Sequence, residues 1–385
     1  MGIATTIYAD YQATTPVDPR VVEQMAPYWN GSFGNPHSSD HVVGWSAAET
    51  VRGAAASVST LIGSDSDEVV FTSGATEANN LALLGLGRRA PAGRRRILVS
   101  AIEHKCVLAS ARALEDREDF SVEVIPVDAD GLVRLDVLED MVDESVLVAS
   151  IMVVNNEIGT IQDVRRIGEL LRRHGVLFHC DAAQAPCAVD VGDLAAHADL
   201  VSLSGHKLYG PKGIGALYVR REFHDRIEPL FYGGGQQRGL RSGTTPVPLC
   251  VGMAAAADIV RSEDRVVERE RVSRLRDSFV QGILNSPVTA ELNGPTDGKR
   301  HPGNANVRFQ DVDAEDLLGV LQPRLAASTG SACGSGIPEP SHVLRALGLS
   351  EVEARSSVRF SFGRFTTQED VDTASDLVRD ALGRL

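Results

Sequence analysis

Lys207 lies in a glycine-rich connection between two short apolar runs, residues 198–203 and 216–219. The connection covers residues 204–215 and reads SGHKLYGPKGIG. Short apolar runs bounded by glycines are typical of buried strands, so this stretch predicts an α/β protein with Lys207 at the mouth of a sheet. A lysine partly withdrawn from water has a lowered pKa, and its neutral amine can form a Schiff base with an aldehyde. The alternative is a phosphate-binding lysine beside flexible glycines, although the spacing does not match a Walker loop.

Composition and charge exclude several classes of protein. The chain has 385 residues, of which 43% are apolar, enough for a large core in more than one domain. A net charge of −14 argues against direct binding of nucleic acid, although a basic protein partner would be attracted. No apolar run reaches membrane-spanning length and no signal-peptide pattern opens the sequence, so we expect a cytoplasmic protein without membrane contact. The five cysteines form no Cys-x-x-Cys pair, so we expect no disulfide framework and no metal site, which leaves open a single reactive thiol.

A strand, a turn of small residues and a helix follow one another between residues 68 and 84. The turn contains Gly74, Ala75 and Thr76, and the helical pattern covers residues 78–84. The first turn of a helix carries free backbone N–H groups and the positive end of the helix dipole, so this unit predicts a cup for an anion. The alternative is an ordinary capped turn with Thr76 in the first helical turn.

Polar residues follow three further apolar runs, at the end where each run leaves the predicted sheet. His104 follows residues 97–100, Asn156 follows the long run 146–154, and Asp181 follows residues 176–180. Open α/β sheets bind ligands at the carboxyl ends of their strands. A buried acid such as Asp181 is costly without a cationic partner, so we expect one. The alternatives are a helix-capping or surface role for His104 and a helix N-cap for Asp181.

The last third of the chain predicts a second domain. A glycine-rich loop with two arginines, residues 231–244, precedes a charged helical run at about 258–284 that leads out of the sheet. Mixed strands and helices follow it. We therefore expect a large cofactor-binding domain at 15–255 and a small α+β domain made of 1–14 and 256–385.

Together these residues satisfy what pyridoxal 5'-phosphate requires of a protein. The cofactor needs a lysine, an acid to keep the pyridine nitrogen protonated, an anion cup for the phosphate and a group that covers the ring. Lys207, Asp181, the turn around Ala75 and His104 supply one each, all at strand ends of one predicted sheet.

The motifs also carry a family resemblance over nearly the whole length. The chain resembles the cysteine desulfurases of the NifS/IscS kind, in the class V aminotransferase-like group of pyridoxal phosphate enzymes. The matching motifs are YADYQATTPVD from Tyr8, SGATE from Ser73, EH at Glu103, NNEIG from Asn155, DAAQ from Asp181, SGHK from Ser204, RSGT from Arg241 and GSAC from Gly330. The resemblance implies the aminotransferase-like fold (fold type I), with a mostly parallel sheet between helices in the large domain.

The resemblance also assigns roles to the residues that match the family's motifs. Lys207 is expected to form the Schiff base and take protons, with His104 stacked on the ring, relaying protons. Asp181 is expected to pair with the pyridine nitrogen and Gln184 to donate to the ring oxygen. The residues expected to hold the phosphate are Ala75, Thr76, Ser204, His206 and, from a neighbouring subunit, Thr244. Asn156 and Arg359 are expected to bind the substrate, with Arg359 gripping its carboxylate.

Cys333 gains its expected role from the same resemblance. It lies among small residues at 328–336, a composition that predicts a loop instead of a packed helix or strand. L-cysteine would be converted to L-alanine while its sulfur passes to Cys333 as a persulfide and then to an acceptor protein. A homodimer is implied as well, because Thr244 would complete the neighbour's site. The alternatives are a selenocysteine lyase or another class V aminotransferase-like enzyme, and a sulfur carrier or scaffold without turnover.

The acceptor is not fixed by the resemblance. Many relatives have threonine or serine after the loop cysteine, whereas this chain has Gly334-Ser335-Gly336, and residues 338–347 match the long-loop subgroup. Relatives of that pattern feed iron–sulfur cluster assembly, tRNA thiolation or the phosphorothioation of DNA. The loop at 34–41 and the glycine-flanked Cys333 favour the DNA-modification pathway alongside iron–sulfur supply.

Overall fold

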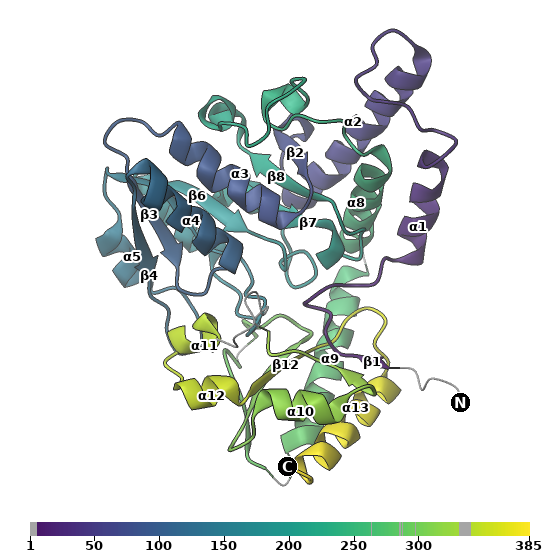
Figure 1. Cartoon of the computed structure of the whole chain (residues 1–385), viewed down its shortest axis with the longest axis vertical. Helices are drawn as coiled ribbons and strands as arrows, with labels where there is room; N and C mark the ends of the chain where they lie inside the picture. The colour runs from purple at the N-terminus through teal and green to yellow at the C-terminus, as the bar shows by residue number, and fades with distance from the viewer. Residues whose placement is uncertain (1–5, 263, 285, 287, 297, 331–339) are drawn as a thin grey trace.

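The computed structural model describes residues 6–262, 264–284, 286, 288–296, 298–330 and 340–385. Figure 1 shows two units, a larger one at the top built on one sheet and a smaller one below it on another, with the C-terminus in the smaller unit. The mixed α/β fold with a mostly parallel main sheet confirms the expected fold class. Among the described residues no helix is long and apolar enough to cross a membrane.

The larger sheet has seven strands in the order β2-β8-β7-β6-β5-β3-β4. The strands are β2 Val69–Thr72, β3 Arg96–Ser100, β4 Ser121–Ile125, β5 Val146–Ser150, β6 Leu177–Asp181, β7 Leu200–Ser204 and β8 Gly215–Val219. All neighbours are parallel except β8, which runs antiparallel to both β2 and β7. Strands β5 to β8 are buried along their whole length because helices cover both faces, which explains their continuous apolar sequences.

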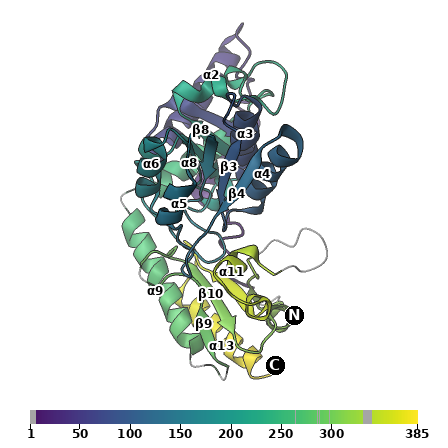
Figure 2. The ribbon, with the colours of Figure 1, turned by 90° about the vertical axis from the view of Figure 1, so that its left-hand side faces the viewer.

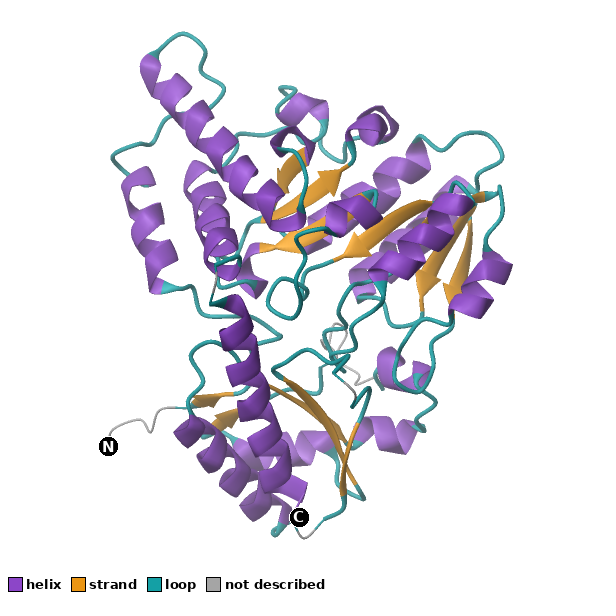
Figure 3. Ribbon diagram, turned by 180° about the vertical axis from the view of Figure 1, so that it is seen from behind, coloured by secondary structure: helices purple, strands orange, loops and turns teal. Residues whose placement is uncertain are grey.

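Two sets of helices cover this sheet, as Figure 3 shows from behind. On one face lie α3 Ala75–Arg88 and α4 Lys105–Glu118, which pack on the sheet residues Val70, Val99 and Leu217. The other face is covered by α1 Pro19–Met25, α2 Val42–Ile62, α5 Leu135–Met141, α6 Val164–Arg173, α7 Leu194–His197 and α8 Val247–Val260. The short 3-10 helices are η1 Ala26–Tyr28, η2 Ser66–Glu68, η3 Gly205–Lys207, η4 Arg221–Arg226 and η5 Gln237–Gly239.

The smaller unit is built on an antiparallel sheet of β9 Ala290–Leu292, β10 Asn304–Phe309 and β12 Ser357–Ser361. Its helices are α9 Arg265–Leu284, α10 Ala314–Leu321, α11 His342–Ala346, α12 Glu351–Arg355 and α13 Gln368–Leu382. Figure 2 shows α9 running down the side of this unit from the level of the larger sheet. Phe279 of α9 packs against Phe360 and Phe362 to form the centre of its core.

The N-terminal segment belongs to the smaller unit before it reaches the larger one. Strand β1 Ile7–Tyr8 pairs in parallel with β11 Leu325–Ala326, and Asp10 forms a bridge to Ser361 of β12. Residues 10–14 then pass to the larger unit, where α1 begins at Pro19. We call residues 10–14 the N-terminal arm. The expected domain boundaries, 15–255 against 1–14 with 256–385, stay a prediction.

Two expected elements differ from the structure. The run 146–154 was expected to be one strand, but β5 ends at Ser150. The N–H groups of Ile151 and Val153 still bond to backbone oxygens of β6, and the chain turns away at Val154, which bridges to Ile161. The charged run at 258–284 was expected to be one helix, but α8 ends at Val260 and α9 begins at Arg265. Hydrophobicity alone could not place the end of β5, since residues 151–154 remain buried beyond the strand.

Candidate active site

A cavity of about 660 Å³ lies where the carboxyl ends of β6 and β7 meet the N-terminal arm and β12. Apart from Thr244 and Cys333, every residue expected at the site lines it. These residues are Ala75, Thr76, His104, Asn156, Asp181, Gln184, Ser204, His206, Lys207 and Arg359. Thr244 is exposed and is absent from the lining of this chain's cavity, and Cys333 lies outside the described residues.

Lys207 ends the short helix η3 that follows β7. The loop is tight, because a Cβ on Gly205 would stand 2.8 Å from the carbonyl oxygen of Pro211. Lys207 Nζ donates hydrogen bonds to the carbonyl oxygens of Gln12 and Ala13, the latter at 2.9 Å. Burial, with the positive charge of Arg359 as a second cause, lowers the pKa of Lys207 to about 8. About a tenth of the amine is therefore neutral at pH 7, which is the form that reacts with an aldehyde.

Asp181 is the last residue of β6 and is 5% exposed. Its carboxylate accepts hydrogen bonds from Asn79 Nδ2 at 2.7 Å and from the backbone N–H of Ala183 at 2.9 Å. Two neutral donors of the chain hold this carboxylate, and no ion pair of Asp181 occurs among the described residues, so the expected cationic partner stays a prediction. The helix N-cap alternative fails, since the next helix begins only at Leu194.

His104 is both the N-cap of α4 and a wall of the cavity. Its Nδ1 accepts a hydrogen bond from the backbone N–H of Cys106 at 3.2 Å and lies 3.0 Å from Cys106 Sγ. The neutral ring therefore carries its proton on Nε2. Withdrawal from water lowers the pKa of His104, an effect that the charge of Asp181 opposes. The capping alternative and the catalytic prediction are thus compatible at this residue.

The anion cup is the start of α3, a helix of 14 residues whose first residues are Ala75 and Thr76. The groups around it include the side chains of Ser204, His206 and Lys212. Burial and the nearby Lys207 charge lower the pKa of His206 to about 4, so its ring is neutral at pH 7. Free N–H groups of a first turn, beside hydroxyl and lysine donors, suit a phosphate.

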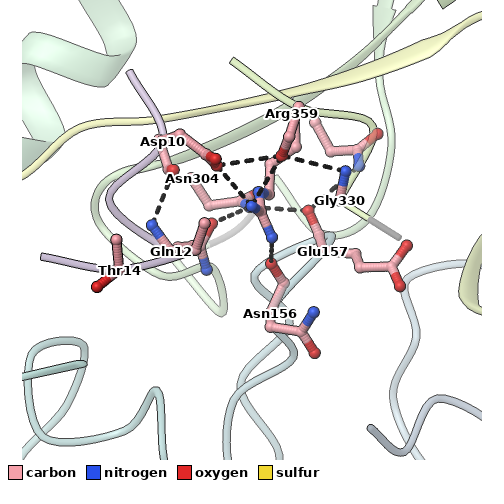
Figure 4. Close-up of polar contacts among 12 residues, drawn as sticks. Asp10, Gln12, Thr14, Asn156, Glu157, Asn304, Gly330 and Arg359 are labelled. Atoms are coloured by element: carbon pink, nitrogen blue, oxygen red, sulfur yellow. Dashed lines mark hydrogen bonds and ion pairs between the residues drawn. The ribbon is translucent and has the colours of Figure 1, made fainter. Parts of the chain in front are cut away.

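Arg359 forms the opposite wall, on the smaller unit (Figure 4). It pairs with Asp10 at 2.6 Å and donates to the backbone oxygen of Asn156 at 2.7 Å and to Ser328 Oγ at 2.9 Å. The backbones of Ser328 and Arg359 also exchange hydrogen bonds. The segment that leads to Cys333 is therefore anchored in the cavity wall at Ser328 and Gly330.

Four buried side-chain atoms lack a hydrogen-bond partner within the described part of the chain, and all four belong to residues that line this cavity. They are Gln12 Nε2, Asn79 Oδ1, Glu103 Oε2 and Arg359 Nε. Buried polar atoms without partners are rare and costly, so their gathering marks a cavity shaped for a polar ligand. With a lysine of lowered pKa, a buried carboxylate and a helix start on its walls, the cavity fits pyridoxal 5'-phosphate.

Several lining residues escaped prediction from the sequence. Asn79 lies one helical turn after Thr76, so helical spacing could have indicated its place at the cavity. Glu103, beside His104, is fully buried, and burial together with the charge of Asp181 raises its pKa to about 8. Asp10 and Gln12 lie in the matched motif YADYQATTPVD, but the motif gave them no role, because their neighbours in the cavity come from distant parts of the chain.

Comparison with known proteins agrees with this geometry. Residues 7–373 match the model of the class-V aminotransferase family. The chain belongs to this family. It is 45% identical over 384 residues to the cysteine desulfurase IscS of Rickettsia rickettsii (strain Iowa), a match that covers 100% of the chain and 93% of the relative.

Two solved structures extend the comparison. A NifS-like protein superposes with a TM-score of 0.91 at 34% identity, covering 99% of this chain and all of that one. SspA in complex with cysteine superposes with a TM-score of 0.81 at 37% identity, covering 94% of this chain and all of that one. The resemblance, the fold and the dependence on pyridoxal phosphate that the sequence predicts are thereby confirmed. Within the described residues no group of three or more His, Cys, Asp or Glu could hold a metal ion.

Proposed function

We propose that the chain is a pyridoxal phosphate-dependent cysteine desulfurase that works through Cys333. The overall reaction converts L-cysteine and the Cys333 thiol into L-alanine and a Cys333 persulfide. The observation that carries the proposal is one cavity whose walls supply Lys207, Asp181, the α3 start and Arg359, with the anchor of the Cys333 segment beside them. The 45% identity to a cysteine desulfurase over the full length supports the same reaction.

Pyridoxal 5'-phosphate, when bound, supplies an aldehyde for amines and a ring that withdraws electrons from the substrate's bonds. Lys207 would offer the amine that holds the aldehyde, and Asp181 would keep a proton on the pyridine nitrogen. Gln184 would donate toward the ring oxygen, and His104 would cover the ring. The phosphate would be held by Ala75, Thr76, Ser204 and His206 of one subunit and by Thr244 of a second copy.

The chain's own residues then bind the substrate and move its protons. Arg359 holds the carboxylate of L-cysteine, and Asn156 lies beside it on the same wall. Lys207 would take the α proton of the substrate at Nζ, because burial lowers the pKa of this amine to about 8. His104 can donate at Nε2, since Cys106 occupies its Nδ1.

Sulfur transfer would follow from the role that the family resemblance gives to Cys333. The Cys333 thiolate attacks the substrate's sulfur, the carbon–sulfur bond breaks, and the carbon takes up a proton to give L-alanine. No outside oxidant is consumed, because the substrate carbon is reduced as the sulfur pair is oxidised to a persulfide. A second thiol or an acceptor protein then removes the outer sulfur.

The partners follow from the same reasoning. The substrate is L-cysteine, the assembly is a homodimer that shares Thr244, and the product sulfur goes to an acceptor protein. That acceptor serves DNA phosphorothioation, iron–sulfur cluster assembly or tRNA thiolation. The net charge of −14 favours a protein acceptor over direct contact with nucleic acid. A cytoplasmic location stays the expectation from the sequence.

The test is alanine release from L-cysteine in the presence of a thiol, with the intact chain compared with Cys333→Ser. We expect alanine from the intact chain, almost none from the variant, and a mass increase of one sulfur atom on Cys333 when the reducing thiol is omitted. Alanine from both proteins would remove Cys333 from the reaction and favour a lyase. Absence of alanine with both proteins would favour the alternative of a sulfur carrier or scaffold without turnover.

A further inference from the structure

The side chain of Gln12, a cavity-lining residue of the N-terminal arm, has an unused donor. Gln12 is 2% exposed and lines the cavity wall, and its Nε2 has no hydrogen-bond partner among the described residues. Its main chain is held firmly, because its N–H donates to Ser361 Oγ at 3.0 Å and its carbonyl accepts from Gln184 Nε2 at 2.9 Å. The backbone position from which the Gln12 side chain extends is therefore fixed.

Neighbouring residues fix which end of the Gln12 amide is the donor. Arg300, which can only donate, gives a hydrogen bond of 2.8 Å to Asn304 Oδ1. The other end of the Asn304 amide is therefore Nδ2, which donates to Gln12 Oε1 at 2.6 Å and to the backbone oxygen of Glu157 at 2.9 Å. Gln12 must present its oxygen to Asn304, as Figure 4 shows, so its nitrogen is the end that is left without a partner among the described residues.

A second unused donor lies on the same wall. Arg359 Nε is buried without a partner in the described residues, while the other two guanidinium nitrogens are occupied by Asp10, Ser328 and Asn156. The arm and β12 are neighbours, since Asp10 bridges to Ser361. Two N–H donors on adjacent segments favour a ligand group that only accepts, and a carboxylate is such a group.

The ion pair beside the cavity explains why an uncharged donor would help to bind a carboxylate. The ion pair between Asp10 and Arg359 is already formed, with side-chain exposures of 17% and 4%. The guanidinium charge is thus largely cancelled before a substrate arrives, so attraction by Arg359 alone is weakened. A donor that adds no charge, such as the Gln12 amide, strengthens carboxylate binding without disturbing that pair.

We propose that Gln12 is a substrate-binding residue whose Nε2 donates a hydrogen bond to the carboxylate of the bound L-amino acid. By this contact Gln12 makes the cavity select α-amino acids over simple amines. The inference rests on the proposed function for its substrate, but it concerns the carboxylate and not the sulfur. It can therefore be tested with a ligand that has no sulfur.

The experiment titrates the cofactor-loaded protein with L-alanine and with ethylamine, which is L-alanine without its carboxylate, and follows the cofactor's absorption band. Gln12→Met has a similar length and no donor, whereas Gln12→Glu keeps an oxygen for Asn304 Nδ2. We expect Gln12→Met to raise the Kd of L-alanine at least about ten-fold, the usual loss for a hydrogen bond to a charged group. The loss should be larger in Gln12→Glu, and ethylamine should change less than about two-fold in both variants.

Equal losses for the two ligands, or no loss for L-alanine, would overturn the inference. Cofactor content is measured first, and if Gln12→Met does not hold the cofactor, Gln12→Glu carries the same comparison with its bond to Asn304 retained. Failure of the proposed function appears separately, as absence of alanine release from L-cysteine by the intact chain. Even with that result, the ratio of the Kd values for L-alanine and ethylamine could still be measured.

Discussion

Replacing Asp10 by asparagine should move stability and ligand affinity in opposite directions. Asp10 binds Arg359 at 2.6 Å in a largely buried pair, and Ser328 Oγ donates to the same carboxylate oxygen at 3.1 Å. Asparagine is isosteric and its Oδ1 can still accept these bonds, but it loses the charge. The difference between a charged and a neutral hydrogen bond is about 1–2 kcal/mol, so we expect a loss of that size in unfolding free energy.

The same change should tighten carboxylate binding. With Asp10 neutral, the Arg359 guanidinium keeps its full charge for the ligand and the repulsion between two carboxylates disappears. At the effective dielectric of a protein site this is worth about 1.4 kcal/mol or more, which corresponds to a Kd for L-alanine about ten-fold lower. Spectral titration of the loaded protein measures this constant, and ethylamine, which has no carboxylate, should bind unchanged.

Asp18→Asn is the matched control for Asp10→Asn. Asp18 is 2% exposed and pairs with Arg364 at 2.8 Å, but it does not line the cavity. Its variant should lose stability in chemical denaturation without changing either ligand's Kd. Weaker binding of L-alanine by Asp10→Asn, or an equal change for ethylamine, would refute the idea that Asp10 competes with the substrate for Arg359.

Two further predictions concern pH. The pKa of Lys207 is lowered to about 8, so the neutral fraction of its amine rises about five-fold from pH 7 to pH 8. The rate at which cofactor-free protein takes up pyridoxal 5'-phosphate, measured by absorbance, should rise by the same factor and level off above about pH 8. A flat pH profile would contradict the lowered pKa. Burial raises the pKa of Glu103 to about 8. Between about pH 4.5 and pH 8 the folded chain therefore keeps the proton on this carboxyl, whereas the unfolded chain has lost it. The free energy of unfolding decreases progressively across this pH range. Glu103→Gln should remove that loss, so the variant's advantage in denaturant midpoint should grow up to pH 8; a constant difference across this range would show that Glu103 does not titrate there.

The sequence predicted the reactive side of the cavity better than the opposite side. Lys207, Asp181 and the α3 start follow buried strands, and parallel strands deliver their carboxyl ends to one edge, so local patterns were sufficient. At Asp181, burial of an acid predicts a partner but not its type. Within the chain this partner is the amide of Asn79, 102 residues away, which no local pattern could indicate.

The other side could not be predicted from pattern, because it depends on long-range folding. Asp10 meets Arg359 across 349 residues, and Gln12 meets Asn304 across 292. The segments involved, an irregular arm and two strands of a small antiparallel sheet, have no periodicity that fixes which side chains face the larger unit. Family resemblance named Arg359, and only the fold revealed Asp10 and Gln12 beside it.

The path of the N-terminal arm means that the two units cannot be separated without losing part of the site. The arm joins its own strand pairing in the smaller unit to the lysine loop of the larger one, through the carbonyls of Gln12 and Ala13. An isolated larger unit would keep its sheet but lose one wall of the cavity and the acceptors that hold Lys207. The two units are therefore not interchangeable parts, and a chimera with a foreign smaller unit would need to inherit residues 10–14 together with β12 to keep a working site.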